Sequence, residues 1–190
     1  MNIHQLPPGA VLIGQGKQGS VYKLSSDRCV KLYNNEKYAR MEYESYCHAE
    51  GSPIIPKLYD HGPNYLVIEF IDGEPLRKVL SRRGTITRNE TEQILHIIHE
   101  MMRLGFTRID VALFHIYIQE GAPSKIIDLV NSYNRQYLIP KVMLKGLAKM
   151  GLLAPFMLHI KELDSDMYRK WMNHIETRSD RYGNLRAFDQ

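Results

Sequence analysis

The sequence predicts an α+β fold in two parts, a strand-rich N-terminal lobe over residues 1–71 and a helical C-terminal lobe over residues 72–190. Short apolar, β-branched runs bounded by turn residues recur in the first part and are typical of strands. Apolar residues at helical spacing dominate the second part. Between the two, the segment Asp72–Pro75 contains glycine and proline, which favour a break where the pattern changes.

The N-terminal part is expected to contain short strands and one helix. The strands are predicted over residues 10–13, 21–24, 29–33, 57–60 and 65–70. A helix is expected from about Glu36 to Glu50, because the turn Gly51–Pro53 then stops it. This strand order places one helix between the third and fourth strands.

The clearest helix of the C-terminal part is predicted over residues 88–104. Thr87 and Glu90 have the spacing of a capping box, and Gly105 supplies a stop signal. One face of this helix is apolar at three- and four-residue spacing, through Ile94, Ile97, Ile98, Met101 and Leu104. Such a face predicts packing against a core.

The segments after this helix are shorter. Residues 111–118 are apolar with possible β character, and residues 125–128 are predicted as a short buried strand ending in a carboxylate. Beyond residue 138 the chain is predicted to be helical, with a helix starting near Pro140 and broken at Ala154–Pro155.

The composition limits the class of protein. A chain with 44% hydrophobic and 24% charged residues is typical of globular domains, and a net charge of +4 does not indicate a dedicated nucleic-acid binder. Cys29 and Cys47 are too few for a disulfide framework or a CxxC-type zinc site. Without a signal peptide or a long apolar run, we expect no transmembrane segment and a reduced, cytoplasmic location.

A glycine-rich turn lies between the first two predicted strands. Gly14, Gly16 and Gly19 are followed by Val21 in a strand, whereas in dinucleotide-binding units such glycines open a helix. Glycine has no Cβ, so backbone N–H groups can close over a phosphate. The turn therefore predicts a hairpin that covers phosphates, with Lys31 on the next strand placed to reach them.

Several carboxylates accompany this lysine in the sequence. Glu42, with Glu44 as the alternative, lies on the following helix and is expected to hold Lys31 in place. Asp110 follows the long helix, and Asp128 ends the short buried strand. Each acid taken singly is an ordinary solvated residue, but their order after a glycine hairpin and a lysine strand predicts phosphoryl transfer.

This order of motifs resembles the protein-kinase-like superfamily over about residues 8–133. The similarity is greatest to small atypical serine/threonine kinase-like proteins of bacteria and archaea, and extends to Rio kinases and aminoglycoside phosphotransferases. The residues that carry it are Gly14-x-Gly16-x-x-Gly19-x-Val21, Cys29-Val30-Lys31, Glu42, the hinge-like Val67–Leu76, Asp110 and Ile126-Ile127-Asp128. The resemblance implies a bilobal protein-kinase-like fold with a reduced helical C-terminal lobe, since about sixty residues follow Asp128.

The resemblance also implies ATP as ligand, with Mg²⁺ or Mn²⁺ as the metal. Lys31 would then contact the phosphates and pair with Glu42, Asp128 would bind the metal, and Asp110 would accept the proton of the acceptor hydroxyl. For the rest of the nucleotide, the glycines would cover the phosphates, Val21 and Cys29 would line the adenine faces, and the backbones at Glu69 and Ile71 would meet the adenine edge.

The sequence departs from the family pattern in its downstream motifs. Arg108-Ile109 precedes the proposed base, where kinases have His-Arg or His-Gly, and the triplet Asp128-Leu129-Val130 lacks the usual glycine. His115 stands where an asparagine normally helps to bind metal. Magnesium prefers oxygen ligands and imidazole suits manganese better, so His115 is either a metal ligand or a histidine that holds an aspartate.

Two functions follow from these observations. The first is an ATP-dependent phosphotransferase of the atypical serine/threonine protein kinase type, which uses a protein hydroxyl or a small alcohol as acceptor. The alternative is a nucleotide-binding pseudokinase or scaffold that acts through protein contacts. Outside these motifs, Lys141, Lys145 and Lys149 recur every four residues, which is typical of a solvated helix face and is also compatible with an acidic partner or anionic lipid.

Overall fold

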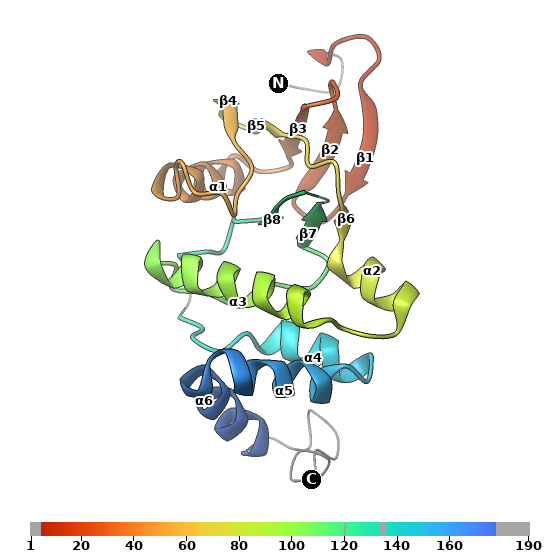
Figure 1. Ribbon diagram of the computed structural model, residues 1–190. Coiled ribbons are helices and arrows are strands. Elements are labelled where there is room, and N and C mark those ends of the chain that lie inside the picture. Colours follow the sequence, from red (N-terminus) through yellow and green to blue (C-terminus); the bar gives the residue numbers. More distant parts are fainter. Residues whose placement is uncertain (1–4, 120, 134–135, 178–190) are drawn as a thin grey trace. The chain divides into compact units, whose positions relative to one another are not determined.

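The protein is described by a computed structural model that covers residues 5–119, 121–133 and 136–177. Within these residues it is a mixed α+β protein with a five-stranded antiparallel sheet and six helices (Figure 1). The chain divides into two compact units. Unit 1 consists of Met1–Gly73 with Tyr117–Asn134, and unit 2 of Glu74–Ile116 with Arg135–Gln190. Two separate stretches of sequence therefore build each unit.

The five-stranded sheet of unit 1 has the strand order β1-β2-β3-β5-β4, and neighbouring strands are antiparallel. Its strands are β1 (Val11–Gln15), β2 (Gly19–Lys23), β3 (Arg28–Tyr33), β4 (Leu58–Gly62) and β5 (Tyr65–Glu69). All five strands were expected from the sequence and are confirmed, with ends shifted by a few residues. Short apolar, β-branched runs between turn residues located them, although β1 and β4 contain no buried residue.

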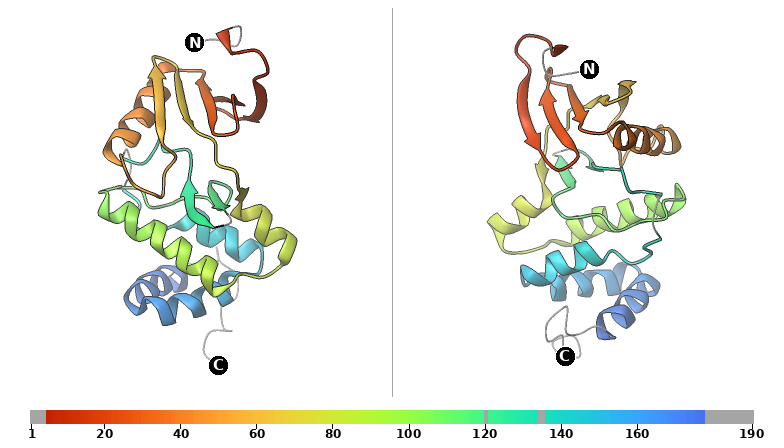
Figure 2. Two further views of the ribbon diagram at one scale, coloured as in Figure 1. Left: turned by 45° about the horizontal axis from the view of Figure 1, so that its top comes forward. Right: turned by 180° about the vertical axis from the view of Figure 1, so that it is seen from behind.

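Helix α1 (Glu36–His48) contacts β3, β4 and β5 of this sheet (Figure 2). The side chain of Asn35 caps the helix by accepting the N–H of Lys37 at 2.8 Å. The helix buries Ala39, Glu42, Ser45 and Tyr46, whose spacing places them on one face. A carboxylate therefore faces the sheet from the middle of the helix.

Strands β7 (Ile116–Gln119) and β8 (Ala122–Ile126) are neighbours in a second, small sheet. The N–H of Ile126 donates to the carbonyl of Ile54 at 2.8 Å and joins β8 to the rest of unit 1. The strand predicted over residues 125–128 was therefore placed too late, because β8 already ends at Ile126. Beyond it, Asp128 adopts a left-handed backbone conformation with φ of 65°, which no strand can include.

Unit 2 is helical. After the two-residue strand β6 (Glu74–Pro75), its helices are α2 (Leu76–Arg83), α3 (Arg88–Arg103), α4 (Lys141–Lys149), α5 (Leu153–Leu163) and α6 (Ser165–Glu176). Helix α5 contacts α3, α4 and α6 (Figure 1). The capping box of Thr87 and Glu90 on α3 is present as predicted, and Gly105 follows the helix with φ of 72°. No helix in the described ranges is long and apolar enough to span a membrane.

The predicted helix break at Ala154–Pro155 is wrong. These residues lie in the first turn of α5, and the break between α4 and α5 comes earlier, at Gly151 and Leu152. Proline is tolerated in a first turn because the N–H groups there have no intrahelical partner. Gly151 adopts φ of 71°, a conformation that ends a helix easily.

The glycine turn between β1 and β2 contains one glycine that the sheet itself requires. A Cβ on Gly19 would lie 1.8 Å from the carbonyl oxygen of Leu32 on β3, whereas a Cβ on Gly16 would meet nothing within 4 Å. The N–H of Gly16 donates to the carbonyl of Gly19 at 2.9 Å and closes the turn. Gly19 is thus needed for close strand approach, and Gly16 leaves open space beside the turn.

We predict that Gly19→Ala lowers the free energy of unfolding by about 3 kcal/mol, because backbone atoms of β3 must move to admit the methyl group. Gly16→Ala is the matched control and should change it by no more than about 0.5 kcal/mol. Urea denaturation followed by circular dichroism measures both values. Equal destabilisation by the two substitutions would contradict this account of Gly19.

Candidate functional site

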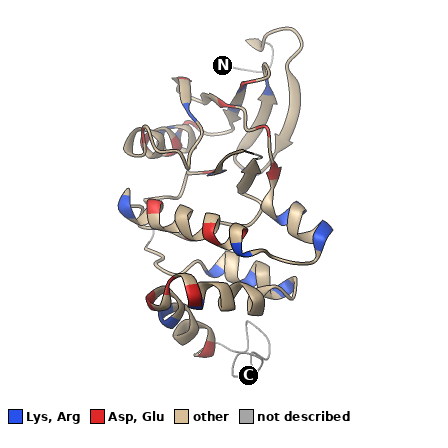
Figure 3. Cartoon of the chain, in the orientation of Figure 1, with Lys and Arg blue, Asp and Glu red and all other residues tan. Residues whose placement is uncertain are grey.

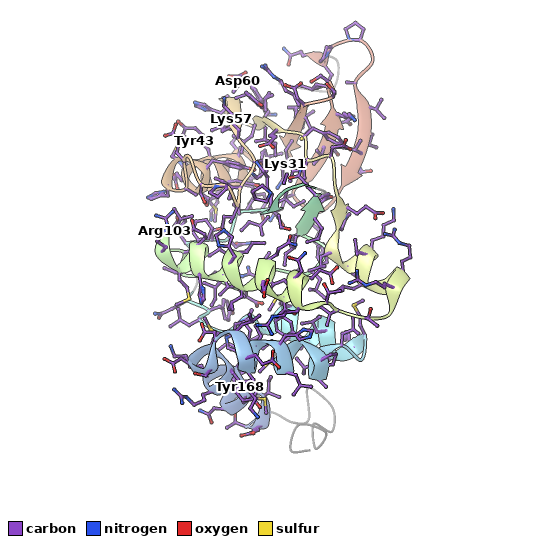
Figure 4. The ribbon with its side chains drawn as sticks, in the orientation of Figure 1. Lys31, Tyr43, Lys57, Asp60, Arg103 and Tyr168 are labelled. Atoms are coloured by element: carbon purple, nitrogen blue, oxygen red, sulfur yellow. The ribbon has the colours of Figure 1, made fainter. Side chains whose placement is uncertain are left out.

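The candidate site in unit 1 centres on a lysine between two carboxylates. Lys31, labelled in Figure 4, lies on β3. Its Nζ is 2.6 Å from Oε2 of Glu42 on α1 and 3.1 Å from Oδ1 of Asp128, which follows β8. The lysine side chain is 13% exposed and that of Glu42 only 1%. Lys31 and Glu42 lie on consecutive elements, β3 and α1, whereas Asp128 is 97 residues from Lys31 in the sequence, and the structure brings the three side chains together.

Glu42 is fixed by further donors besides the lysine. The hydroxyl of Tyr33 donates to its Oε2 at 2.7 Å, and the N–H of Leu129 donates to its Oε1 at 3.1 Å. The hydroxyl of Ser45, one turn later on α1, donates to the carbonyl of Leu129 at 2.9 Å. Both oxygens of the buried carboxylate are therefore hydrogen-bonded, as burial of a charge requires. Glu44, the alternative partner considered from the sequence, is exposed.

The electrostatics keep Lys31 charged. Burial alone disfavours the ammonium, but the attraction of Glu42 and then of Asp128 outweighs it, so the pKa of Lys31 is raised above its ordinary value. Burial and the neighbouring Glu42 also raise the pKa of the Tyr33 phenol, which stays a neutral donor. Lys31 is therefore a fixed cation held between two carboxylates.

Asp128 has an uncommon backbone conformation. Its φ of 65° is the only positive value for a non-glycine residue in the described ranges. Aspartate is among the few residues that adopt this conformation, and isolated cases cluster at functional sites. Its side chain is 28% exposed, so the carboxylate contacts Lys31 and remains accessible to solvent.

A cavity of about 110 Å³ adjoins this cluster. Of the predicted site residues, those that line it are Val21, Cys29, Lys31, Glu42, Glu69, Ile71 and Asp128. The sequence reasoning missed five others, namely Ile13, Ile68, Phe70, Tyr117 and Ile127. Ile68 and Phe70 lie in the hinge-like segment Val67–Leu76 and Ile127 in the motif Ile126-Ile127-Asp128, but no site role was predicted for them; for Tyr117 the one sequence signal is the apolar run 111–118. The walls of the cavity are mostly apolar, as is typical of ligand sites.

At one edge of the cavity, backbone groups of Glu69 and Ile71 can form further hydrogen bonds. The carbonyl of Glu69 accepts a weak bond from Sγ of Cys29 at 3.8 Å, which places this oxygen beside a cavity-lining thiol. Buried Ile71 has an N–H that donates to no group in the described part of the chain. An acceptor and a donor two residues apart form a pattern that the edge of a purine can complement. Burial raises the pKa of the Cys29 thiol to about 12, so it remains protonated.

The predicted phosphate-covering glycines differ in what surrounds them. Gly19 is constrained by β3, as described above. A Cβ on Gly14 would make an ordinary contact with Val21 at 3.8 Å, and one on Gly16 would project into open space. The approach of a phosphate to Gly14 and Gly16 stays a prediction.

Asp110, the predicted base, belongs to unit 2 and contacts the start of α4. Its Oδ1 accepts the N–H of Val142 at 2.7 Å, and the N–H of Met143 also hydrogen-bonds to it. The N-cap residue of α4, Pro140, provides no side-chain cap, so Asp110 satisfies donors that the helix leaves open. Burial raises the pKa of Asp110 above its ordinary value despite these bonds. This structural contact was missed because it joins residues far apart in the sequence.

His115, also in unit 2, is half-buried with its ring edge-on to Phe114 at 4.2 Å between centroids. No group of three or more histidine, cysteine, aspartate or glutamate side chains that could hold a metal occurs in the described ranges. Magnesium in phosphate sites is commonly held by one or two carboxylates plus the phosphates. The predicted roles of Asp128 and His115 as metal ligands stay predictions.

A larger cavity, of about 660 Å³, lies elsewhere in unit 1. Figure 4 labels Tyr43, Lys57 and Asp60, which line it beside α1 and β4. Inside it, Nζ of Lys125 lies 2.6 Å from Oε2 of Glu69, an ion pair that the sequence did not indicate. Glu69 is the one predicted site residue that lines this cavity, so the chemistry of the Lys31 cluster lies in the smaller one.

The chain is similar in sequence to a protein with a kinase name. No protein-family model matches the chain. Over 123 residues it is 24% identical to a Bacillus subtilis (strain 168) protein named "Putative serine/threonine-protein kinase YrzF". The match covers 62% of this chain and 57% of that protein. The similarity supports a kinase-like relationship and nothing more specific.

We predict that Glu42→Gln lowers the free energy of unfolding by about 2–4 kcal/mol, because it leaves Lys31 with Asp128 as its one anionic partner in a largely buried place. Glu44→Gln, two residues later on the same helix and exposed, should change it by at most about 0.5 kcal/mol. Chemical denaturation of both variants measures the difference. If Glu42→Gln proved as stable as Glu44→Gln, the buried pair would not be a constraint on the fold.

Proposed function

We propose that the chain is an ATP-dependent phosphotransferase with a bilobal protein-kinase-like fold and a reduced helical C-terminal lobe. In this proposal it transfers the γ-phosphoryl group to a hydroxyl, with the serine or threonine of a protein as acceptor. The observation that carries the proposal is the Lys31–Glu42–Asp128 cluster at the edge of an apolar cavity. The similarity to a kinase-named protein is consistent with it.

The adenine is proposed to enter the cavity beside β3. Val21 and Cys29 would contact its faces, while the carbonyl of Glu69 and the N–H of Ile71 would meet its edge. A volume of about 110 Å³ is below the range of about 300–1,000 Å³ usual for whole ligands. Only part of a nucleotide fits inside, and the phosphates would extend past Lys31 toward the glycine turn.

The charges of the cluster suit a bound triphosphate. Lys31 would contact the phosphates, and the buried carboxylate of Glu42 would keep the ammonium in position. Asp128 is the more exposed carboxylate and the one suited to a metal ligand. Mg²⁺ or Mn²⁺, when bound, would neutralise charge on the phosphates.

Asp110 is the proposed base. A general base near a hydroxyl assists transfer when its pKa is raised toward working pH, and burial shifts the pKa of Asp110 in that direction. In this proposal Asp110 contacts the acceptor hydroxyl while its Oδ1 continues to accept the N–H of Val142. The group would orient the hydroxyl and take its proton late in the transfer.

A second function, that of a nucleotide-binding pseudokinase, is favoured by the same residue. An aspartate that caps α4 has a structural reason to be present whether or not it performs catalysis. His115 in place of the usual asparagine points the same way, since imidazole is a poor ligand for magnesium. The two functions share nucleotide binding and differ in turnover.

We predict that millimolar ATP with Mg²⁺ or Mn²⁺ raises the melting temperature of the protein, because a ligand that binds only the folded state stabilises it. Lys31→Ala should abolish most of this shift. Lys37→Ala removes an exposed lysine from α1 and should leave the shift unchanged. Differential scanning fluorimetry measures the three proteins. An equal shift in wild type and Lys31→Ala would remove the support for nucleotide at this site.

We predict that Asp110→Asn reduces turnover at least about 100-fold while preserving stability, because asparagine caps a helix as well as aspartate does but is no base. Asp110→Ala removes both roles and should also cost about 1 kcal/mol of stability.

Asp128→Asn should weaken metal-dependent ATP binding as well as turnover. His115→Asn should gain activity with Mg²⁺ if the imidazole blocks that metal. ATP hydrolysis and autophosphorylation of the wild type and the variants are measured with Mg²⁺ and with Mn²⁺. Wild-type turnover in Asp110→Asn would exclude the base, and an inactive wild type that still binds ATP would favour the pseudokinase.

A further inference from the structure

A groove with an apolar floor and a basic rim lies in unit 2. It has a volume of about 300 Å³ and is formed by α4, the start of α2 and residues 112–114. Leu113, Phe114, Val142 and Met150 provide its apolar surface. Its charged lining residues are all cations, Arg77, Lys145 and Lys149. We call this feature the α4 groove.

The three cations have no carboxylate partner within residues 5–119, 121–133 and 136–177. Neighbouring basic residues on α2 are paired, since Lys78 and Arg82 both contact Glu74 at 3.0 and 2.9 Å. Figure 3 shows the basic positions of α2 and α4. Among the described residues, the three cations of the α4 groove therefore lack the ion pairs that the neighbouring Lys78 and Arg82 make with Glu74.

The floor of the groove is unusually exposed for apolar side chains. Phe114 is 47% and Val142 44% exposed, beside Leu113, which is buried. Exposed apolar groups gathered in a hollow are typical of a binding surface. Together with three unpaired cations, they complement a ligand that carries both an apolar side chain and carboxylates.

The groove adjoins the proposed base. Val142 lines it, and the backbone N–H of the same residue donates to Oδ1 of Asp110 at 2.7 Å. A chain segment held in the groove would thus lie next to the carboxylate that we assign to the acceptor hydroxyl. This adjacency lies wholly within unit 2.

We propose that the α4 groove binds an acidic peptide segment of the phosphoacceptor protein. An apolar side chain of the segment contacts Phe114 and Val142, and its carboxylates pair with Arg77, Lys145 and Lys149. The role as an acceptor site rests on the proposed phosphotransferase function, whereas peptide binding itself does not. The substrate class is accordingly a protein whose target serine or threonine has acidic and apolar neighbours.

A membrane surface fits the groove less well than a peptide. Interfacial helices insert a continuous apolar face, but the apolar face of α4 is buried in unit 2 through Met143, Leu144 and Leu147. Only two of the three regularly spaced lysines of α4 line the groove, Lys145 and Lys149, because Lys141 lies over the ring of Tyr137, with its Nζ 5.4 Å from the ring centroid. What remains is a short hollow suited to one or two side chains.

The test is peptide binding without nucleotide, measured by fluorescence anisotropy. The probe is a fluorescein-labelled peptide in which glutamates flank one phenylalanine and one serine, and its control has lysine for every glutamate. The acidic peptide should bind wild type, and added salt should weaken it. Lys149→Glu should weaken binding about tenfold, since it replaces an attraction with a repulsion. Phe114→Ala should weaken it by a similar factor.

Lys170→Glu is the matched control. Lys170 is exposed on α6 of the same unit, and its substitution changes the net charge by the same amount as Lys149→Glu. It should weaken binding less than about twofold. Equal effects of Lys149→Glu and Lys170→Glu, or no binding of the acidic peptide, would overturn the proposal. Binding of phosphatidylserine vesicles that is lost in Lys149→Glu, with no peptide binding, would overturn it in favour of a lipid surface.

The two proposals fail in different ways. If the peptide binds but ATP produces no thermal shift, the phosphotransferase function fails and the α4 groove stands as a peptide site. If ATP binds and turns over but the peptide does not bind, the groove proposal fails alone. If both bind and the serine of the probe is never phosphorylated, the acceptor role is overturned and docking remains.

Discussion

The buried ion pair between Lys31 and Glu42 is the interaction on which unit 1 depends. A carboxylate with 1% of its side chain exposed is tolerable only while both of its oxygens have donors, and these donors are Lys31 and Tyr33 of β3 and the backbone N–H of Leu129. The requirement fixes the rotation of α1 on the sheet. It also draws the segment after β8 into unit 1, although that segment lies in the second half of the sequence.

The two carboxylates that contact Lys31 differ in their exposure to solvent. Lys31 contacts one enclosed carboxylate, that of Glu42, and one partly exposed carboxylate, that of Asp128. The left-handed backbone at Asp128 supports this division, since it turns the carboxylate back toward Lys31 just after the strand. The enclosed partner and the solvent-accessible partner of one cation are thus two different carboxylates.

The sequence predicted the elements whose signals are local. Strand alternation, the glycine turn and the capping box of α3 depend on neighbours in the chain, and each was located to within a few residues. The choice of Glu42 over Glu44 was also within reach, because Glu42 shares a helical face with Ala39 and Tyr46. The cap that Asp110 provides for α4, and the pair of Lys125 with Glu69, join residues far apart in the chain. No spacing rule in a single sequence predicts such contacts.

The two cysteines have unequal chemistry as a consequence of their places on unit 1. Thiolates, not thiols, are attacked by oxidants and alkylating agents, and Cys29 with a pKa of about 12 holds almost no thiolate at neutral pH. Cys47 is exposed on α1. Oxidative damage should therefore accumulate on the outer surface of α1 while the thiol beside Lys31 stays reduced.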